Sequence, residues 1–298
     1  TTLMVHNSDV TLQDLELAWG SGIGGGLLAG TSASVTLDHT TVHNNHGSYG
    51  GGIYVNTGSV VTLTNDSDVI NNTATIYGGG ARVWGTLVGT ETYSDISDNC
   101  APHGGGVSVN QGTLWLDDSD MDQNEAAAAT GMGGGIYAVA GKVVLDGNAW
   151  VYNGDAYDGA GIYANGASLT LMNGNVGGND AVHDGGGFYL TNGSILTGTN
   201  SGTGLGSSRI GQHGYSNSAR YGGGAYLDGS RLTFAGSIAE NTASERGGGI
   251  AALGASDLTI GQALLHKNTA VGYGGGIYAQ DSILNVHHTH MHRNVGTR

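Results

Sequence analysis

Residues 133–138 read GGGIYA, and close copies of this hexapeptide recur along the whole chain. The intervals between successive glycine triplets run from 25 to 37 residues and are most often 26. The triplets begin at Gly24, Gly50, Gly78, Gly104, Gly133, Gly159 (as Gly-Ala-Gly), Gly185, Gly222, Gly247 and Gly274. Self-similarity at a period of this length is typical of proteins built from stacked repeats. The sequence therefore predicts about eleven repeats of roughly 27 residues each.

The apolar residues inside each repeat are spaced by two. Examples are VTLDHTTVHNN at 35–45 and LTIGQALLHKN at 258–268. A period of two is that of a β-strand, and no stretch of ten residues shows the 3.6-residue period of a helix. We expect three short strands per repeat, each pairing with its counterpart in the next repeat. The predicted fold is an all-β, single-stranded parallel β-helix that forms one domain over residues 1–298.

Composition narrows the classes of function. The chain has 298 residues, of which 58 are glycine, and it carries a formal charge of −15 with only nine Lys and Arg residues. Affinity for nucleic acid comes from neutralising phosphates with basic residues, so nucleic acid is not an expected partner. The absence of an apolar run of about 18 residues argues against direct membrane insertion. A single cysteine excludes an internal disulfide framework.

Tyrosines occupy the outward place of the strand that follows the glycines. Because neighbouring side chains on a strand face opposite ways, the apolar first and third residues point inward and the middle one outward. The middle residue is tyrosine at Tyr54, Tyr137, Tyr163, Tyr189, Tyr226 and Tyr278. Four of them fall in successive repeats, which predicts an exposed stripe of rings able to contact a glycan or a protein partner. The alternative is that tyrosine simply suits a strand and shields the backbone beneath it.

An asparagine closes most repeats, three residues after an inward apolar residue. We assign this place to Asn45, Asn72, Asn99, Asn124, Asn153, Asn179, Asn217, Asn241, Asn268 and Asn294. Amides stacked at one turn can hydrogen-bond to each other and to backbone groups that a turn leaves unpaired. These residues are predicted to form a structural ladder.

Two further clusters are candidates for metal binding. Asp118, Asp120 and Asp122 alternate, and carboxylate oxygens suit Ca²⁺, although the loop glycine and distal Glu of an EF-hand are missing; a solvated acidic edge is the alternative. His288, His290 and His292 alternate near the C-terminus, with His266 one repeat earlier, and imidazoles grouped in this way suit a transition metal. Alternate residues of one strand lie about 7 Å apart, which is too far for three of them to share one ion unaided.

The sequence assigns no catalytic residue and no cofactor other than this Ca²⁺ candidate. Carbohydrate-active β-helices need carboxylates beside a basic residue on the outer face of one sheet. No carboxylate occurs at the outward places of the strand that follows the glycines.

The longest interval, 37 residues, is attributed to an inserted Gly/Ser/Thr loop at 198–208. Neither terminal repeat carries a recognisable cap, so we expect a segment of a longer chain or a unit that stacks end to end.

The repeat also carries a family resemblance. The GGGIY element, followed about twenty residues later by Asn-x-Ala (Asn72-Thr73-Ala74, Asn241-Thr242-Ala243, Asn268-Thr269-Ala270), resembles the repeats of bacterial polymorphic outer-membrane proteins and autotransporter passengers. This resemblance implies a right-handed β-helix outside the cell or at its surface, serving in adhesion or as a stalk. The expected partners are a cell-surface protein or glycan, or copies of the chain end to end or side by side. The alternative function is a polysaccharide-binding or polysaccharide-cleaving β-helix similar to the pectin-lyase superfold.

Overall fold

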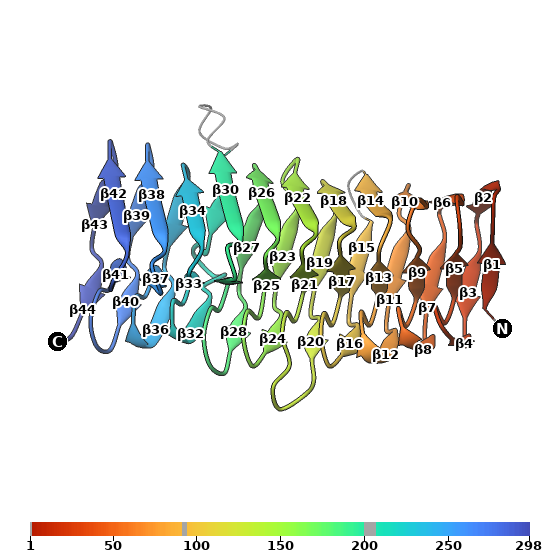
Figure 1. Ribbon diagram of the computed structural model, residues 1–298, viewed down its shortest axis with the longest axis horizontal. Coiled ribbons are helices and arrows are strands. Elements are labelled where there is room, and N and C mark those ends of the chain that lie inside the picture. Colours follow the sequence, from red (N-terminus) through yellow and green to blue (C-terminus); the bar gives the residue numbers. More distant parts are fainter. Residues whose placement is uncertain (1, 91–93, 200–206) are drawn as a thin grey trace.

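The computed structural model describes residues 2–90, 94–199 and 207–298, which form a rod of stacked coils with the two termini at opposite ends (Figure 1). All regular secondary structure within these ranges is β-strand. The described residues therefore contain no helix that could cross a membrane. The strands recur four to a coil and assemble into four parallel sheets of eleven strands, named sheets A to D here.

Sheets A and B carry most of the apolar side chains. Sheet A consists of β1 (Leu3–Val5), β5 (Leu27–Ala29), β9 (Ile53–Val55), β13 (Ala81–Val83), β17 (Val107–Asn110), β21 (Ile136–Val139), β25 (Ile162–Asn165), β29 (Phe188–Thr191), β33 (Ala225–Asp228), β37 (Ile250–Leu253) and β41 (Ile277–Ala279). Sheet B consists of β2 (Asp9–Gln13), β6 (Ser34–Asp38), β10 (Val60–Thr64), β14 (Thr86–Thr90), β18 (Thr113–Asp117), β22 (Lys142–Asp146), β26 (Ser168–Met172), β30 (Ile195–Thr199), β34 (Arg231–Phe234), β38 (Asp257–Gly261) and β42 (Ile283–His287).

Sheets C and D complete each coil with shorter strands. Sheet C consists of β3 (Glu16–Ala18), β7 (Thr41–His43), β11 (Asp68–Ile70), β15 (Asp95–Ser97), β19 (Asp120–Asp122), β23 (Trp150–Tyr152), β27 (Asn175–Gly177), β31 (Arg209–Ile210), β35 (Ser237–Ala239), β39 (Leu264–His266) and β43 (His290–His292). Sheet D consists of β4 (Ser21–Gly22), β8 (His46–Tyr49), β12 (Thr73–Tyr77), β16 (Cys100–Ala101), β20 (Glu125–Ala126), β24 (Asp155–Ala156), β28 (Asp180–Ala181), β32 (Ser218–Tyr221), β36 (Thr242–Arg246), β40 (Thr269–Ala270) and β44 (Val295–Gly296).

The strands pair in the register that the repeat predicts. Ile136 lies beside Ile162 and Tyr137 beside Tyr163, so equivalent residues of successive coils stack directly on each other. The inward residues of sheets A, B and C form one continuous core along the rod, with Phe188 and Phe234 the largest fully buried side chains. The prediction of a parallel β-solenoid with about eleven coils is confirmed.

The expectation of three strands per coil is wrong, because sheet D adds a fourth. Its strands have a small inward residue, as at Ala126, Ala156 and Ala181, and these alanines form a separate small cluster. Strands of two to five residues with one inward alanine or glycine show no apolar alternation. The sequence signal that marks them is the alanine of the Asn-x-Ala element.

Asparagines stack in two runs at the turn between sheets C and D. Nδ2 of Asn72 donates to Oδ1 of Asn99 (3.1 Å) and to the carbonyl of Val42 (2.8 Å). Oδ1 of Asn72 accepts from the backbone N–H and Nδ2 of Asn45, both at 3.0 Å. The amides of successive ladder residues are hydrogen-bonded in the same way through Asn45, Asn72, Asn99 and Asn124, and again through Asn179, Asn217, Asn241, Asn268 and Asn294.

Asn153 does not belong to this ladder, which corrects the sequence assignment. The residue three positions after the inward Val151 is Gly154, whose backbone N–H donates to Oδ1 of Asn179 (2.9 Å). Asn153 is an exposed turn residue with φ of 50°, and its Nδ2 donates to Oδ1 of Asp122 (2.9 Å). The two runs of amides are therefore separated at Gly154.

The glycine triplet lets the chain turn closely against this ladder. Gly50 has φ of +66°, and a Cβ there would lie 2.0 Å from the carbonyl oxygen of Ile53. A Cβ on Gly52 would lie 2.8 Å from the carbonyl oxygen of Gly80 and 2.9 Å from Nδ2 of Asn72. Only glycine fits such a conformation and such an approach.

The extra residues of the longest repeat fall at two places. The segment from Thr199 to Arg209 spans ten positions where the preceding coil, from Met172 to Asn175, spans three. Most of the loop assigned to 198–208 lies outside the described residues, at 200–206. A second excursion separates Ile210 from the ladder residue Asn217 by seven positions instead of three, and within it Tyr215 pairs with Gln212 across a tight turn.

Candidate binding surface

Four tyrosines of the predicted stripe form a continuous stack on the outer face of sheet A. Ring centroids lie 5.4 Å apart for Tyr137 and Tyr163, 5.0 Å for Tyr163 and Tyr189, and 4.9 Å for Tyr189 and Tyr226. The interplanar angles are 15°, 19° and 36°. We call these four residues the tyrosine ladder. The spacing follows from the strand separation of a sheet, because each ring stands on an equivalent position of the next coil.

Stacking determines which part of each ring a partner can reach. Each inner ring is covered on both faces by its neighbours, so the ladder presents ring edges and hydroxyl groups rather than open aromatic faces. Tyr163 is only 8% exposed, and the other three are half-buried. None of the four hydroxyl groups has a hydrogen-bond partner among the described residues. Burial raises the pKa of Tyr163 and of Tyr226 to about 12, so these hydroxyls stay protonated and can donate.

The other two tyrosines of the stripe stand apart from this stack. Tyr54 is separated from Tyr137 by Arg82 and Ser108, which occupy the outward place in the two coils between them. Tyr278 is separated from Tyr226 by Ala251. Arginines lie at both interruptions. Arg82 packs on the rings of Tyr77 and Trp84, and Nη1 of Arg246 donates to the hydroxyl of Tyr278 (3.0 Å).

A charged cluster borders the ladder at the corner between sheets D and A. Nε and Nη2 of Arg220 donate to the two carboxylate oxygens of Asp184 (3.1 and 3.0 Å), and the backbone N–H of Tyr221 donates to Oδ1. Nδ1 of His183 lies 2.9 Å from Oδ1 of Asp158 and 3.4 Å from Oδ2 of Asp184. Burial raises the pKa of Asp158.

This cluster has the residue types of a metal site but is already internally paired. The ligand atoms of Asp158, His183 and Asp184 lie within 4.8 Å of one another. Among the described residues, this is the group of three metal-ligating side chains that lie close enough together to share an ion. Asp184 is only 3% exposed, and the Arg220 guanidinium already neutralises its carboxylate. The cluster therefore orders the corner of the coil beside the tyrosine ladder.

A signal for this cluster is present in the sequence. Asp158 and Asp184 each immediately precede the first residue of a glycine triplet, at the same place as Tyr77, His103 and Tyr221 in other coils. The stripe predicted for this face contains only the outward residues that follow the glycines. Because the chain bends sharply through the triplet, the residue before it lies beside the tyrosine four positions after its start.

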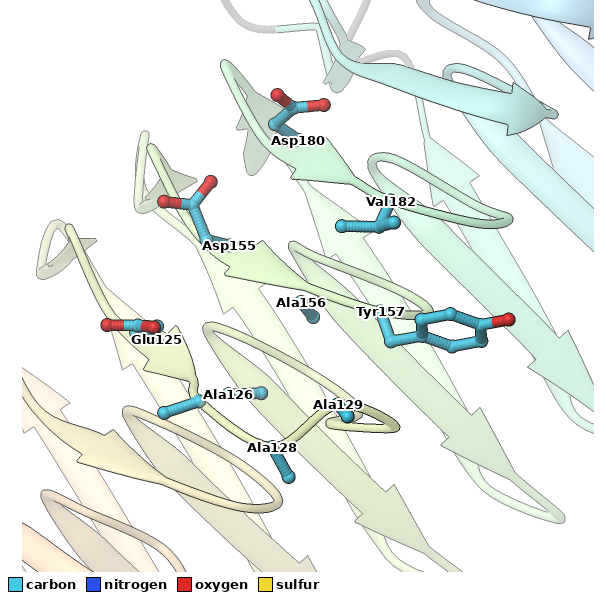
Figure 2. A pocket seen from close by; sticks show the side chains of 10 residues that line it. Glu125, Ala126, Ala128, Ala129, Asp155, Ala156, Tyr157, Asp180 and Val182 are labelled. Atoms are coloured by element: carbon cyan, nitrogen blue, oxygen red, sulfur yellow. The ribbon is translucent and has the colours of Figure 1, made fainter.

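A shallow groove of about 460 Å³ runs along the outside of sheet D next to this corner. Figure 2 shows Glu125, Asp155 and Asp180 in a row along one side, with Tyr157 and Val182 on the other. Alanines of the underlying strands form its floor. The ring of Tyr157 stacks on that of His183 at 4.8 Å, so the groove adjoins the charged cluster.

The aspartates suggested for calcium do not converge. Asp120 and Asp122 point outward from β19, whereas Asp118 lies in the exposed turn before that strand, with φ of 53°. The two oxygens of Asp122 accept from Nδ2 of Asn153 and Nε2 of Gln123, both at 2.9 Å. Within the described ranges these three carboxylates form no common group of ligand atoms.

The histidines suggested for a transition metal are only partly brought together. His266 and His292 stack with ring centroids 5.2 Å apart, as expected for adjacent coils. His290 faces outward at the other end of β43, and His288 lies in the preceding turn with its ring against His287. Burial is the main cause of the lowered pKa of His266, and the neighbouring His292 adds to it.

Comparison with known proteins finds no match. This holds for protein-family models, for curated proteins and for solved structures. What is established is a parallel β-solenoid of about eleven coils with the tyrosine ladder and the charged cluster on its surface.

Proposed function

We propose that the protein is a non-enzymatic structural and adhesive β-solenoid outside the cell, similar in role to autotransporter passengers, and that the tyrosine ladder is its contact surface. The observation that supports this most is the row of phenol hydroxyls at strand spacing, without hydrogen-bond partners among the described residues. An unbranched rod of stacked coils suits a stalk, because it extends by repetition and presents one face along its whole length.

The chemistry of the ladder favours a linear polysaccharide as its partner. Hydroxyl groups both donate and accept, as the hydroxyls of a glycan do. Equal spacing along the rod allows successive sugar units to be bound by successive tyrosines. Because the ring faces are already stacked on one another, binding would occur through hydrogen bonds at the edge and not through sugar rings lying on aromatic faces.

Removing the hydroxyls while keeping the rings tests this proposal. The variant Tyr137→Phe/Tyr163→Phe/Tyr189→Phe/Tyr226→Phe preserves the stack, and Tyr49→Phe, outside the ladder, is the matched control. On a glycan array, wild type and control are expected to bind the same polysaccharide. The fourfold variant should bind it more than about tenfold more weakly, since each lost hydrogen bond costs about 1 kcal/mol. Unchanged binding by the fourfold variant would leave the ladder with a structural role only.

A second candidate, polysaccharide cleavage, rests on Asp158. A carboxyl group with a raised pKa beside a second carboxyl group is the arrangement that glycosidases use for acid catalysis. The pairing of both oxygens of Asp184 with Arg220 argues against it, because no free carboxylate remains to act as nucleophile or base. New reducing or unsaturated ends after incubation with the bound polysaccharide, lost in Asp158→Asn, would favour this candidate over adhesion.

A further inference from the structure

Three aromatic rings line an open cleft on sheet C, on a different face of the rod from the tyrosine ladder. The cleft has a volume of about 270 Å³ and is lined by Asp120, Trp150, Tyr152 and Tyr215. Ring centroids are 6.0 Å apart for Trp150 and Tyr152, 5.3 Å for Trp150 and Tyr215, and 5.8 Å for Tyr152 and Tyr215. The ring planes meet at 78°, 55° and 88°, so they form steep walls rather than a stack.

The ring of Tyr215 reaches the cleft because the chain has an excursion after β31 and a glycine, Gly177, beside Tyr152. Tyr215 belongs to the excursion that follows β31, and its backbone N–H donates to the carbonyl of Gln212 (2.9 Å) within that loop. The residue of the next coil beside Tyr152 is Gly177, where a Cβ would lie 2.6 Å from the carbonyl oxygen of Tyr215. Absence of a side chain at Gly177 thus allows the excursion to lie against sheet C and bring Tyr215 to the rings of β23.

The cleft is negatively charged as well as aromatic. Asp120 is at its edge, and its Oδ1 accepts from the backbone N–H of Trp150 (3.0 Å). The carboxylates of Asp122, Asp120 and Asp95 all add to the effect of burial in raising the pKa of Tyr152. Arg209 stands two coils from Trp150 and is directed to Asn175, with Nη1 3.4 Å from its Oδ1.

We infer that this cleft binds an alkylated ammonium group, such as the trimethylammonium of choline or of trimethyllysine. A cation is attracted to the faces of aromatic rings within about 6 Å of their centroids, most strongly to Trp. The three centroids are close enough together for one cation at the mouth of the cleft to reach all of them. Methyl groups on the nitrogen spread its charge and pack against the ring surfaces that line the cleft, while Asp120 supplies a compensating negative charge. This inference does not depend on the proposed function of the tyrosine ladder.

Titration with choline, followed by calorimetry and by the change in tryptophan fluorescence, tests the inference. The neutral isostere 3,3-dimethylbutan-1-ol has the same shape without the charge and should bind at least about tenfold more weakly. Tyr215→Ala and Asp120→Asn should each weaken choline binding by about tenfold. Asn keeps the acceptor for the Trp150 N–H, and the exposed tyrosine variant Tyr273→Ala, away from the cleft, should bind as wild type does. Equal binding of the isostere, or no saturable binding of choline, would overturn the inference.

Two further arms identify the source of the ammonium group and the role of its counter-charge. A trimethyllysine peptide compared with its unmodified form tests a protein partner, and vesicles of phosphatidylcholine test a lipid headgroup. Choline binding should also weaken as the pH falls through about 6, where Asp120 gains a proton. Among the described residues, the other ionisable groups near Asp120 are Asp95, Asp118, Asp122 and Tyr152, with Tyr215 across the cleft. Persistence of the full pH dependence in Asp120→Asn would contradict the role given to Asp120.

Discussion

The guanidinium carbon of Arg82 lies 4.6 Å from the centre of the Tyr77 ring. The same group lies 5.2 Å from the Trp84 ring, and Nη1 donates to the hydroxyl of Ser108. Arg82 is only 4% exposed, and within the described residues no carboxylate forms an ion pair with it. Burial lowers the pKa of Arg82 because the charged form loses water. Aromatic faces therefore provide the compensation that a counter-ion usually gives to a buried cation.

Replacing Arg82 with lysine should destabilise the protein by about 1–2 kcal/mol. A lysine ammonium is a compact, strongly hydrated charge that cannot lie flat on the two rings. Urea denaturation followed by circular dichroism measures the change. The control is Arg231→Lys, at an exposed pair with Asp257, which should change stability by less than about 0.5 kcal/mol. An equal effect of the two substitutions would show that the aromatic contacts contribute nothing.

Removing one amide from the ladder should be far more costly than removing an asparagine beside it. Asn72→Ala leaves the buried N–H of Asn45 and the carbonyl of Val42 without their partners, which costs about 2–4 kcal/mol. Asn153→Gly removes an exposed amide and keeps a residue suited to φ of 50°, so its effect should stay within about 0.5 kcal/mol. The comparison is made from the two urea midpoints. Similar losses in both variants would refute the distinction between ladder and turn asparagines.

Restoring the repeat consensus at Gly154 should weaken the protein. Asparagine is the common residue at this place, but a Cβ on Gly154 would lie 2.6 Å from the carbonyl oxygen of Ala160. Relief requires the backbone to move, and overpacking of this kind costs about 1–3 kcal/mol. Gly193→Asn is the matched control, because no atom lies within 4 Å of a Cβ there and asparagine tolerates its φ of +75°. A higher melting temperature for Gly154→Asn would show that the ladder can be completed.

The sequence predicts the coils well because one physical requirement recurs in every repeat. Inward apolar residues spaced by two, such as Ile136 and Ala138, must stack on the same residues of the next coil, and this fixes both period and register. Sheet D was missed because one inward alanine per strand gives no periodic signal. The prediction placed Asn153 in the ladder because it is the asparagine near the end of its repeat. The ladder position is instead fixed by distance along the chain, three residues after the inward Val151, and Gly154 stands there.

The surface sites were less predictable because they join residues from different parts of a coil. Asp158 reaches Tyr163 only through the bend at the glycines, and Tyr215 reaches Trp150 only through an excursion that a repeat alignment treats as an insertion. The position of Tyr163 on an outward place was predicted, but not its burial. Outward direction on a strand leaves a ring exposed only when its neighbours in the adjacent coils are not rings as well.

Asp95 and its neighbour Asp120 both contribute to the pH dependence of stability, and substitution of Asp95 tests its share. Burial, together with Asp120 and other nearby carboxylates, raises the pKa of Asp95 to about 6, above its value in the unfolded chain. The folded state therefore holds this proton more tightly, so the free energy of unfolding should decrease as the pH rises from about 4 to about 6 and then level off.

Asp95→Asn removes this charge and should stabilise the protein above pH 7. The gain should be about 1 kcal/mol, smaller than the full pKa shift implies because the side chain is partly solvated. At pH 4 the variant and wild type should be equally stable, since Asp95 is already protonated in the folded protein. Melting temperatures measured between pH 4 and pH 8 test this expectation. Destabilisation by Asp95→Asn at pH 7.5 would mean that the Asp95 charge is compensated in the folded coil and that the like charges of sheet C do not repel one another.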